Sequence, residues 1–315
     1  MDYQQLARLW RLEATRPRPD LDLPGSPERS LRRMAFEEVS GKIFILEQIA
    51  PAQVKRKQRI AQTMDHLHQH GLKEIHPYLK ANEGHLAQVD DAFWMLRPYV
   101  PGEALNRTTY GADAWRGEHL ADLLLNLRSL PQPDQTPIFS LPNYIRRVVP
   151  ILERRSPDLQ PRLAPVLHFL QQHLDPVYDQ LPTAFCHGDY HPLNIIWGPQ
   201  VIRALIDWEF CGTKPALYDA ALLVGCVGFD EPENLEGPLV RSFLQRLRAS
   251  REFSSAGWEP LIPLMLAIRI AWLREWIVRN EQEAADQELE YMQILMAFHE
   301  ENMLGTRTNT RSSHQ

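Results

Sequence analysis

The first hundred residues alternate apolar and polar positions in a way that predicts a small antiparallel sheet with one packed helix. Residues 3–14 have the apolar spacing of a short amphipathic helix, and "PDLDLPGSPERS" after it has the composition of a loop. In "LRRMAFEEVSGKIFILEQI", two apolar-rich strands flank Ser40 and Gly41, which favour a tight hairpin turn. We expect a helix over residues 53–70 that ends at Gly71, and then a β-rich stretch that closes with "AFWMLRPYV".

Beyond this region the pattern changes to apolar residues at three- and four-residue spacing, which is typical of helices. The change follows "RPYVPGEAL", whose two prolines and glycine indicate a hinge. The sequence therefore predicts an N-terminal lobe over residues 1–97, a mostly helical lobe over 98–304, and a disordered tail over 305–315 with nothing to bury. Helices are expected in the second lobe over residues 112–130, 141–153, 160–180, 216–228, 236–250, 258–280 and 284–303.

The composition of the 315-residue chain is that of a globular protein, with 44% apolar residues and a formal charge of −6. This charge offers no broad basic field for a nucleic-acid partner. No run approaches the roughly 20 apolar residues of a membrane span, and the N-terminus lacks the apolar core of a signal peptide. Three cysteines argue against a disulfide framework. We therefore expect a cytoplasmic protein that binds neither nucleic acid nor membrane, and the oligomeric state is left open.

Polar side chains gather in "FCHGDYHPLNIIWGPQVIRALIDWEF", residues 185–210, between runs that resemble strands. Asp189 and Asn194 lie five positions apart on a loop, and two short strands after them would return Asp207 to their side. One carboxylate would then orient a nucleophile, while the amide oxygen and the second carboxylate hold a divalent cation. Phosphoryl transfer requires this division of labour, and such hard oxygen ligands suit Mg²⁺.

The same residues allow two other interpretations. Asp189 and Asn194 also fit an ordinary turn in which the side chains bond to the local main chain. His187, Asp189 and His191 match a metal-binding pattern of a hydrolase, although no further ligand lies at a suitable spacing. Phosphoryl transfer accounts for more of the cluster, because it gives the amide of Asn194 a role.

Together, "HGDYHPLN" and "ALIDWEF" resemble the aminoglycoside phosphotransferase and choline kinase-like family, small-molecule kinases with the protein-kinase fold. The resemblance implies an α+β, two-lobed protein-kinase-like fold with a small antiparallel sheet in the N-lobe and a largely helical C-lobe. It also implies ATP and Mg²⁺ as cofactors. By this resemblance the site residues are the catalytic base Asp189, the loop-bracing His187, the Mg²⁺ ligands Asn194 and Asp207, and the supporting Asp219 in "KPALYDAALLVG".

Two further stretches resemble the nucleotide-binding parts of this family. "FWMLRPYVPGEAL" resembles the hinge that holds the adenine edge with main-chain groups, here those of Arg97, Pro98 and Tyr99. "LPGSPERSLRRM" matches the position of the loop that covers the nucleotide, so Gly25 and Ser26 are expected to contact it.

The third strand departs from the family, which usually places a Lys or Arg there to hold the phosphates, paired with a helix Glu. Here "GKIFILEQIA" has Glu47 or Gln48 at that position, depending on register, and the helix "VKRKQRIAQTMDHL" contains no Glu. A carboxylate facing the phosphates would repel them. The candidates for a replacement cation are Lys42, Arg33, Lys55 and Lys57.

The acceptor site is indicated by resemblance to late helices that build substrate pockets in related kinases. Trp272 and Trp276 lie on one helical face, a spacing that is more often typical of a core. "AWLREW" is similar to bacterial stress-response kinases that phosphorylate protein serine or threonine. The candidate substrate contacts are His191, Glu209, Arg269, Trp272 and Trp276.

The sequence thus predicts an ATP-dependent phosphotransferase that moves the γ-phosphate to a hydroxyl of a small molecule. One alternative is a protein serine/threonine kinase of the stress-response type. Another is a nucleotide-binding pseudokinase with a regulatory role, which the missing strand Lys favours.

Overall fold

The computed structural model describes residues 3–23, 30–82, 84–134, 136–253 and 257–312. The chain divides into two units. The first unit comprises Met1–Ala104, Ser129–Gln135 and Ile195–Glu209, and the second comprises Leu105–Arg128, Thr136–Asn194 and Phe210–Gln315. The division therefore passes through the polar cluster, after Asn194 and again after Glu209.

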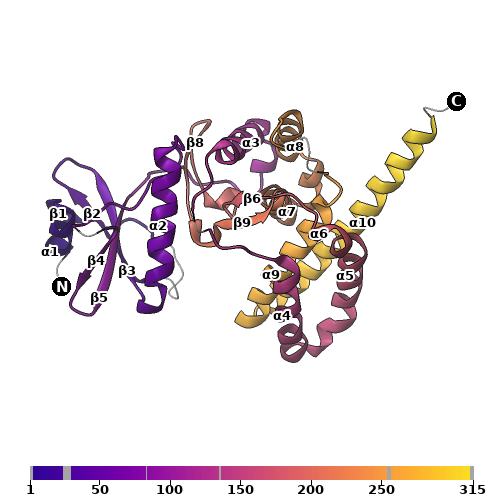
Figure 1. The fold of residues 1–315 in the computed structure, drawn as a ribbon, viewed down its shortest axis with the longest axis horizontal. Helices are drawn as coiled ribbons and strands as arrows, with labels where there is room; N and C mark the ends of the chain where they lie inside the picture. The colour runs from indigo at the N-terminus through magenta and orange to yellow at the C-terminus, as the bar shows by residue number, and fades with distance from the viewer. Residues whose placement is uncertain (1–2, 24–29, 83, 135, 254–256, 313–315) are drawn as a thin grey trace. The chain divides into compact units, whose positions relative to one another are not determined.

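Five antiparallel strands form the sheet of the first unit, in the order β1-β2-β3-β5-β4 (Figure 1). The strands are β1 (Ala14–Pro17), β2 (Ser30–Glu38), β3 (Ile43–Ile49), β4 (Leu86–Val89) and β5 (Ala92–Pro98). Gly41, between β2 and β3, has a φ of 83°, which glycine adopts without steric cost. The hairpin predicted at Ser40 and Gly41 is confirmed.

The sheet buries a different set of side chains on each face, because successive residues of a strand point to opposite sides. α1 (Tyr3–Ala7) lies on one side of the sheet and α2 (Val54–Gln69) lies on the other (Figure 1). The face toward α1 carries an apolar cluster of Leu6, Ala7, Trp10, Ala14, Phe36, Phe44, Leu46, Ala87, Trp94 and Leu96. Glu47 and Arg97 directly follow Leu46 and Leu96, so their side chains leave the sheet on the α2 side.

The N-terminal segment differs from its prediction. A helix was expected over residues 3–14, but α1 and the 3₁₀ turn Arg8–Trp10 end the helical part, and Ala14 begins a strand. Arg11 has a φ of 58°, the left-handed conformation in which helices commonly end. β1 is a four-residue strand at the sheet edge that contains Pro17, a composition with little strand character.

The first unit also contains the two strands predicted after the polar loop. β7 (Ile195–Gly198) and β8 (Val201–Leu205) pair as an antiparallel hairpin. Gln200, in the turn, has a φ of 52°. Asp207 follows the end of β8.

Helices make up most of the second unit, which confirms the predicted α+β fold. α7 (Tyr218–Asp230) is buried along most of its length, because it packs against α9 (Leu261–Arg279). α9 also packs against α4 (Leu141–Arg155) and α10 (Gln282–Ser312). Two short antiparallel strands, β6 (Thr183–Cys186) and β9 (Gly212–Pro215), complete the unit. The helices are α3 (Ala114–Ser129), α4 (Leu141–Arg155), α5 (Gln160–His173), α6 (Asp175–Tyr178), α7 (Tyr218–Asp230), α8 (Pro238–Ala249), α9 (Leu261–Arg279) and α10 (Gln282–Ser312).

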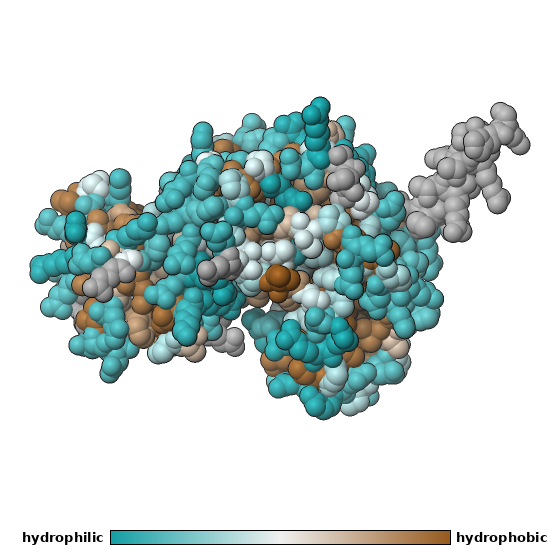
Figure 2. All heavy atoms as spheres, viewed as in Figure 1, coloured by the Kyte–Doolittle hydropathy of each residue, from teal (hydrophilic) through white to brown (hydrophobic). Residues whose placement is uncertain are grey.

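The last helix, α10, continues to Ser312 and so enters the segment 305–315 that was predicted to be a disordered tail. A helix that has already formed gains one main-chain hydrogen bond per added residue, so it can extend through a polar segment. Hydrophilic residues cover most of the face drawn in Figure 2. Among the described residues, no helix has both the length and the apolar character that crossing a membrane requires.

Candidate active site

The loop that carries Asp189 follows the short strand β6. β6 pairs with β9 so that Cys186 lies opposite Gly212, which places the start of the loop beside the chain that follows Phe210. Gly188 has a φ of 83°, and a Cβ atom at this position would lie 2.1 Å from the carbonyl oxygen of Phe210. The loop therefore requires glycine here, both for its backbone conformation and for this close approach.

Asp219, in the first turn of α7, holds the start of the loop through main-chain groups. The N–H of His187 donates to Oδ2 of Asp219 at 2.7 Å, and the N–H of Gly188 donates to Oδ1 at 2.8 Å. Asp219 is 1% exposed. Burial raises its pKa, and this effect outweighs the nearby His187 and the two N–H donors, which favour the ionised form.

Asp189 and Asn194 are in direct contact, as the loop pattern predicts. Nδ2 of Asn194 donates to the main-chain oxygen of Asp189 and to its Oδ2, both at 2.9 Å. Nε2 of His191 lies 3.6 Å from Oδ1 of Asp189. Burial alone would raise the pKa of Asp189, but His191, His187 and the Asn194 amide together hold it below its ordinary value. Asp189 is therefore a carboxylate at neutral pH, the form that accepts a proton.

His187 lies inside the loop rather than at a surface. It has no exposed area, and its Nδ1 accepts the main-chain N–H of Asp189 at 3.3 Å. Its ring meets that of Tyr190 edge to face, with centroids 6.2 Å apart. The bracing role of His187 stays a prediction. The bond at Nδ1 removes one of the two nitrogens that the hydrolase interpretation would use for a metal.

Asp207, the other expected Mg²⁺ ligand, belongs to the first unit. It has a φ of 62°, in the left-handed region that aspartate enters more readily than most residues. Its negative charge acts on Arg97, whose pKa it helps to raise. The convergence of Asp207 with Asp189 and Asn194 stays a prediction.

The expected nucleotide contacts lie in two places. Gly25 and Ser26 fall outside the described residues. Arg97 and Pro98 end β5, and Tyr99 follows it; the N–H of Tyr99 donates to the carbonyl of Ile43 at 2.9 Å. The adenine-binding role of Arg97, Pro98 and Tyr99 stays a prediction. For Arg97, the structure adds a side-chain interaction that the sequence did not indicate.

This interaction centres on Glu47, the residue at the strand position that is usually Lys or Arg. Register places Arg33 of β2 directly opposite Glu47, and Arg97 of β5 opposite Ile45 on the same face. Nε of Arg97 donates to Oε1 of Glu47 at 3.1 Å, and Nε of Arg33 lies 3.4 Å from the same atom. The hydroxyl of Tyr78 donates to Oε2 at 3.2 Å. We call Glu47, Arg33, Tyr78, Arg97 and the nearby Lys57 the Glu47 cluster.

Charge keeps Glu47 ionised although it is only 1% exposed. Burial alone would raise its pKa, but Arg97, Lys57 and Arg33 hold the pKa below its ordinary value. The same surroundings act in the opposite sense on Tyr78: burial, and then the negative charge of Glu47, raise the pKa of Tyr78 to about 12. Cross-strand partners of this kind are visible only once the register is known, which is why the sequence did not reveal them.

Two of the candidate cations, Arg33 and Lys57, pair with acids. Nζ of Lys57 forms an ion pair with Glu209, and both side chains are more than nine-tenths buried. Arg56 donates to the main-chain oxygen of Glu209 at 2.6 Å. Lys42 and Lys55 are exposed on the surface of the first unit. Glu209, a candidate substrate contact, is therefore held by α2.

Among the candidate acceptor residues, His191, Trp272 and Trp276 form a row of rings. The His191 and Trp272 centroids are 6.2 Å apart, and those of Trp272 and Trp276 are 6.1 Å apart. Both indoles are partly exposed. Arg269, in contrast, is 3% exposed, and its Nε and Nη2 donate to the two oxygens of Glu288. Its guanidinium is thus bound inside the helical unit.

One buried lysine near the loop was missed entirely by the sequence analysis. Lys214, in β9, is 4% exposed, and its Nζ donates to the carbonyl of Phe210 at 2.5 Å. Burial lowers its pKa. It supports the same carbonyl that lies against Gly188, so it acts on the shape of the loop. A lone lysine in "CGTKPAL" gives no signal of this kind in a sequence.

The residues present fit a hard cation that takes most of its ligands from water and phosphate. Asn194 uses only Nδ2 in its contacts with Asp189, so Oδ1 accepts no hydrogen bond from the described residues. An amide oxygen and a carboxylate are the donors that Mg²⁺ prefers. The part of the chain that the structure describes contains no group of three or more His, Cys, Asp or Glu side chains placed to hold a metal ion together.

A small antiparallel sheet, a helical unit and an Asp–Asn loop anchored from a buried helix indicate a phosphotransferase of the protein-kinase-like class. A sequence profile described as the phosphotransferase enzyme family matches residues 27–264. The chain belongs to this family.

Solved structures with a similar fold are those of phosphotransferases and kinases. An aminoglycoside phosphotransferase from Alicyclobacillus acidocaldarius subsp. acidocaldarius DSM 446 is 14% identical with a TM-score of 0.62, and the match covers 92% of this chain and 99% of that one. Aminoglycoside 2′-phosphotransferase-IIIa is 15% identical with a TM-score of 0.64, covering 94% and 97%. Amicoumacin kinase hAmiN is 14% identical with a TM-score of 0.63, covering 94% and 92%. At these identities the likeness shows the fold. No curated protein matches the chain.

Proposed function

We propose that this protein transfers the γ-phosphate of ATP to a hydroxyl group of a small molecule. The observation that carries the proposal is the carboxylate of Asp189, which accepts a hydrogen bond from Asn194 on a loop that Asp219 fixes through two main-chain hydrogen bonds. Phosphoryl transfer asks little covalent chemistry of a protein and depends on such positioning.

In the proposed reaction, Asp189 accepts a hydrogen bond from the acceptor hydroxyl and aligns its oxygen with the γ-phosphorus. The bond from this oxygen to phosphorus forms while the bond from phosphorus to the bridging oxygen of ATP breaks, and ADP leaves with those electrons. The hydroxyl proton passes to Asp189 late in the step, because the transition state is loose. A divalent cation would supply neutralisation of phosphate charge, with Asn194 and Asp207 as its expected ligands.

Similar proteins support the choice of a small-molecule acceptor. The structure of amicoumacin kinase hAmiN is a complex with AMP-PNP, Ca²⁺ and Ami, and that of spectinomycin phosphotransferase is a complex with ADP and spectinomycin. In this chain, the partly exposed rings of Trp272 and Trp276 continue from His191, which lies beside Asp189. We propose that this row of rings contacts the acceptor, because flat side chains pack well against the apolar face of a ring-shaped molecule.

Substitution Asp189→Asn tests the proposal. It removes the proton acceptor while keeping the size of the side chain, so we expect turnover to fall by about 10²- to 10⁴-fold. The readout is ADP release over a panel of hydroxyl compounds, together with Mg-AMP-PNP affinity measured by calorimetry, which should stay unchanged. Asp179→Asn, at an exposed position of the second unit, is the matched control. Turnover of Asp189→Asn at the wild-type rate would refute the role of Asp189.

A nucleotide-binding regulator without catalysis is the second candidate, and Glu47 at the strand position favours it. This candidate predicts that the wild-type protein binds ATP but releases no ADP with any acceptor in the panel. The same assay therefore separates the two functions.

A further inference from the structure

The Glu47 cluster places more positive than negative charge on the α2 side of the sheet. Nε of Arg97 and Nε of Arg33 lie 3.1 and 3.4 Å from Oε1 of Glu47, so two arginines share one carboxylate. A buried carboxylate among several cations remains ionised and can serve as a fixed anchor for the groups that pair with it. The cluster therefore presents positive charge at the strand position where the sequence alone indicated a repulsive negative one.

Lys57 is not the cation that is available to a ligand. Its side chain is 4% exposed and forms an ion pair with Glu209. Burial alone would lower its pKa, but the acidic groups around it raise the pKa above its ordinary value. Lys57 thus stays charged, and its charge is balanced within the first unit.

Arg97 differs from Lys57 in both respects. A quarter of its side-chain surface is exposed. Its hydrogen bond and its ion pair within the described residues both use Nε, and both go to Glu47. Neither contact uses the terminal nitrogens Nη1 and Nη2, each of which carries two N–H donors. A guanidinium held in this way has a fixed orientation, and its Nη1 and Nη2 take no part in the contacts with Glu47.

We propose that Arg97, held in place by Glu47, contacts the phosphates of the bound nucleotide. The inference rests on the proposed use of a nucleotide substrate and extends it by naming the residue that binds the phosphates from the first unit. In this arrangement Glu47 is a positioning residue. The planar guanidinium suits this task, since one edge pairs with the carboxylate and the other donates two parallel hydrogen bonds to phosphate oxygens.

The family usually has a positive side chain on the third strand and a Glu on the helix, and here these two charges are exchanged. The strand contributes the negatively charged Glu47, and the helix contributes the positively charged Lys57. A neighbouring strand contributes the phosphate-binding cation. The charge of Asp207, an expected metal ligand, also acts on Arg97. Arg97 therefore lies on the side of the first unit where a metal-bound phosphate is expected.

Calorimetry with two ligands tests this inference. Mg-AMP-PNP has phosphates and adenosine has none, so loss of a phosphate contact weakens only the first. For Arg97→Met we expect the dissociation constant of Mg-AMP-PNP to rise about 10- to 100-fold, as for loss of charge-assisted hydrogen bonds, and that of adenosine to stay within about twofold. Arg97→Lys keeps the charge without the fork and should lie between Arg97→Met and wild type.

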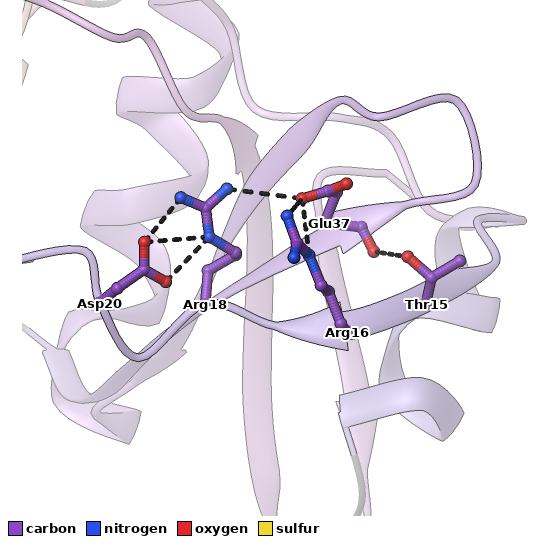
Figure 3. Close-up of polar contacts among 5 residues, drawn as sticks. All are labelled: Thr15, Arg16, Arg18, Asp20 and Glu37. Atoms are coloured by element: carbon purple, nitrogen blue, oxygen red, sulfur yellow. Dashed lines mark hydrogen bonds and ion pairs between the residues drawn. The ribbon is translucent and has the colours of Figure 1, made fainter.

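Arg16→Met is the matched control for Arg97→Met. Arg16 also lies in the sheet, and its Nε donates to a carboxylate of the next strand, Glu37, at 3.0 Å (Figure 3). Its side chain is 64% exposed, however, and it lies in the edge strand β1. Arg16→Met should change neither affinity.

Substitution Glu47→Gln tests the positioning role, because the role determines whether the affinity for Mg-AMP-PNP rises or falls. Removal of a negative charge near the phosphates would by itself strengthen Mg-AMP-PNP binding. If Glu47 orients Arg97, the affinity falls instead, while adenosine binding is unchanged. Stronger Mg-AMP-PNP binding by Glu47→Gln would overturn the positioning role.

The outcomes separate this inference from the proposed function. Wild-type protein that binds neither ligand overturns both. Wild-type protein that binds both ligands, with Arg97→Met and Arg97→Lys showing wild-type affinity for Mg-AMP-PNP, overturns the inference alone and leaves the proposed function in place. Equal weakening of Mg-AMP-PNP and adenosine in both Arg97 variants would also overturn it, because that result indicates a role in structure rather than in phosphate binding.

Discussion

Two buried carboxylates, one in each unit, are held in different ways. Glu47 and Asp219 are both 1% exposed. Glu47 is bound by side chains that come from β2, β5 and the segment after α2. Asp219 is bound by the main-chain N–H groups of His187 and Gly188. The first arrangement fixes charges in space, and the second fixes the path of the chain.

The pKa values of the two acids move in opposite directions for this reason. Burial raises the pKa of Asp219, because N–H groups carry partial charges and compensate only part of the lost hydration. Glu47 meets full positive charges, which outweigh its burial and lower its pKa. The pKa of Asp219 thus stays raised although His187 and Lys214 lie near it, whereas Glu47 remains charged at physiological pH.

Of the variants that test this comparison, Asp219→Ala is expected to lose the most stability. The substitution leaves two buried main-chain N–H groups without their acceptor, so we expect the free energy of unfolding to fall by about 3–5 kcal/mol. Urea denaturation followed by circular dichroism measures this change. Asp122→Ala removes an exposed carboxylate that pairs with Arg246 on the surface of the same unit, and should cost less than about 1 kcal/mol. Equal losses in the two variants would contradict the anchoring role of Asp219.

A smaller loss of stability is expected for Glu47→Gln. The variant leaves Arg33 and Arg97 without their shared carboxylate, but these side chains are 18% and 25% exposed and can regain part of their hydration. We therefore expect the free energy of unfolding to fall by about 1–3 kcal/mol, less than for a fully buried charge. The same denaturation experiment on Glu37→Gln provides the control, because Glu37 also binds two arginines, Arg16 and Arg18, but is itself 22% exposed (Figure 3). A loss for Glu47→Gln no larger than that for Glu37→Gln would argue against a structural role of the buried cluster.

The smallest expected effect is the pH dependence of the stability that each of the two acids contributes. A lowered pKa means that the contribution of Glu47 is present above its ordinary pKa and is lost as pH falls through the folded-state value. The raised pKa of Asp219 has the opposite consequence, since the folded state binds this proton more tightly and gains stability as pH falls.

Denaturation at a series of pH values between neutral and acid measures both effects. As pH falls, the stability difference between wild type and Glu47→Gln should shrink, while that between wild type and Asp219→Asn should grow. Each slope is at most about 1.4 kcal/mol per pH unit, the value for one proton. Slopes of the same sign in the two pairs would show that one of the two pKa directions is wrong.

The parts that the sequence predicted well depend on local patterns. The hairpin at Gly41, the helix that ends before Gly71 and the contact between Asp189 and Asn194 all follow from residues close together in the chain. The supporting Asp219 was identified by resemblance, and the structure shows the hydrogen bonds through which it acts. Short-range geometry of this kind is specified by turn residues and periodicity, so a sequence can reveal it.

The Glu47 cluster could not be predicted because it depends on the register of three strands. The sequence placed either Glu47 or Gln48 at the critical position and proposed four cations, among them Arg33 and Lys57. The structure puts Glu47 on the α2 side. Arg97, whose Nε donates a hydrogen bond to Glu47, had been considered only for its main-chain groups. A shift of one residue in register would turn every one of these side chains to the other face.

The way Asp219 holds the loop has a consequence for how this enzyme family changes over time. The anchor uses the main-chain N–H groups of His187 and Gly188, so it depends on the backbone at these two positions, and Gly188 is required for the close approach to Phe210. The side chains of α9 that we propose to contact the acceptor take no part in this anchor, so they can be exchanged while the loop keeps its path. Main-chain groups thus hold the loop, and side chains are left to set the proposed choice of acceptor.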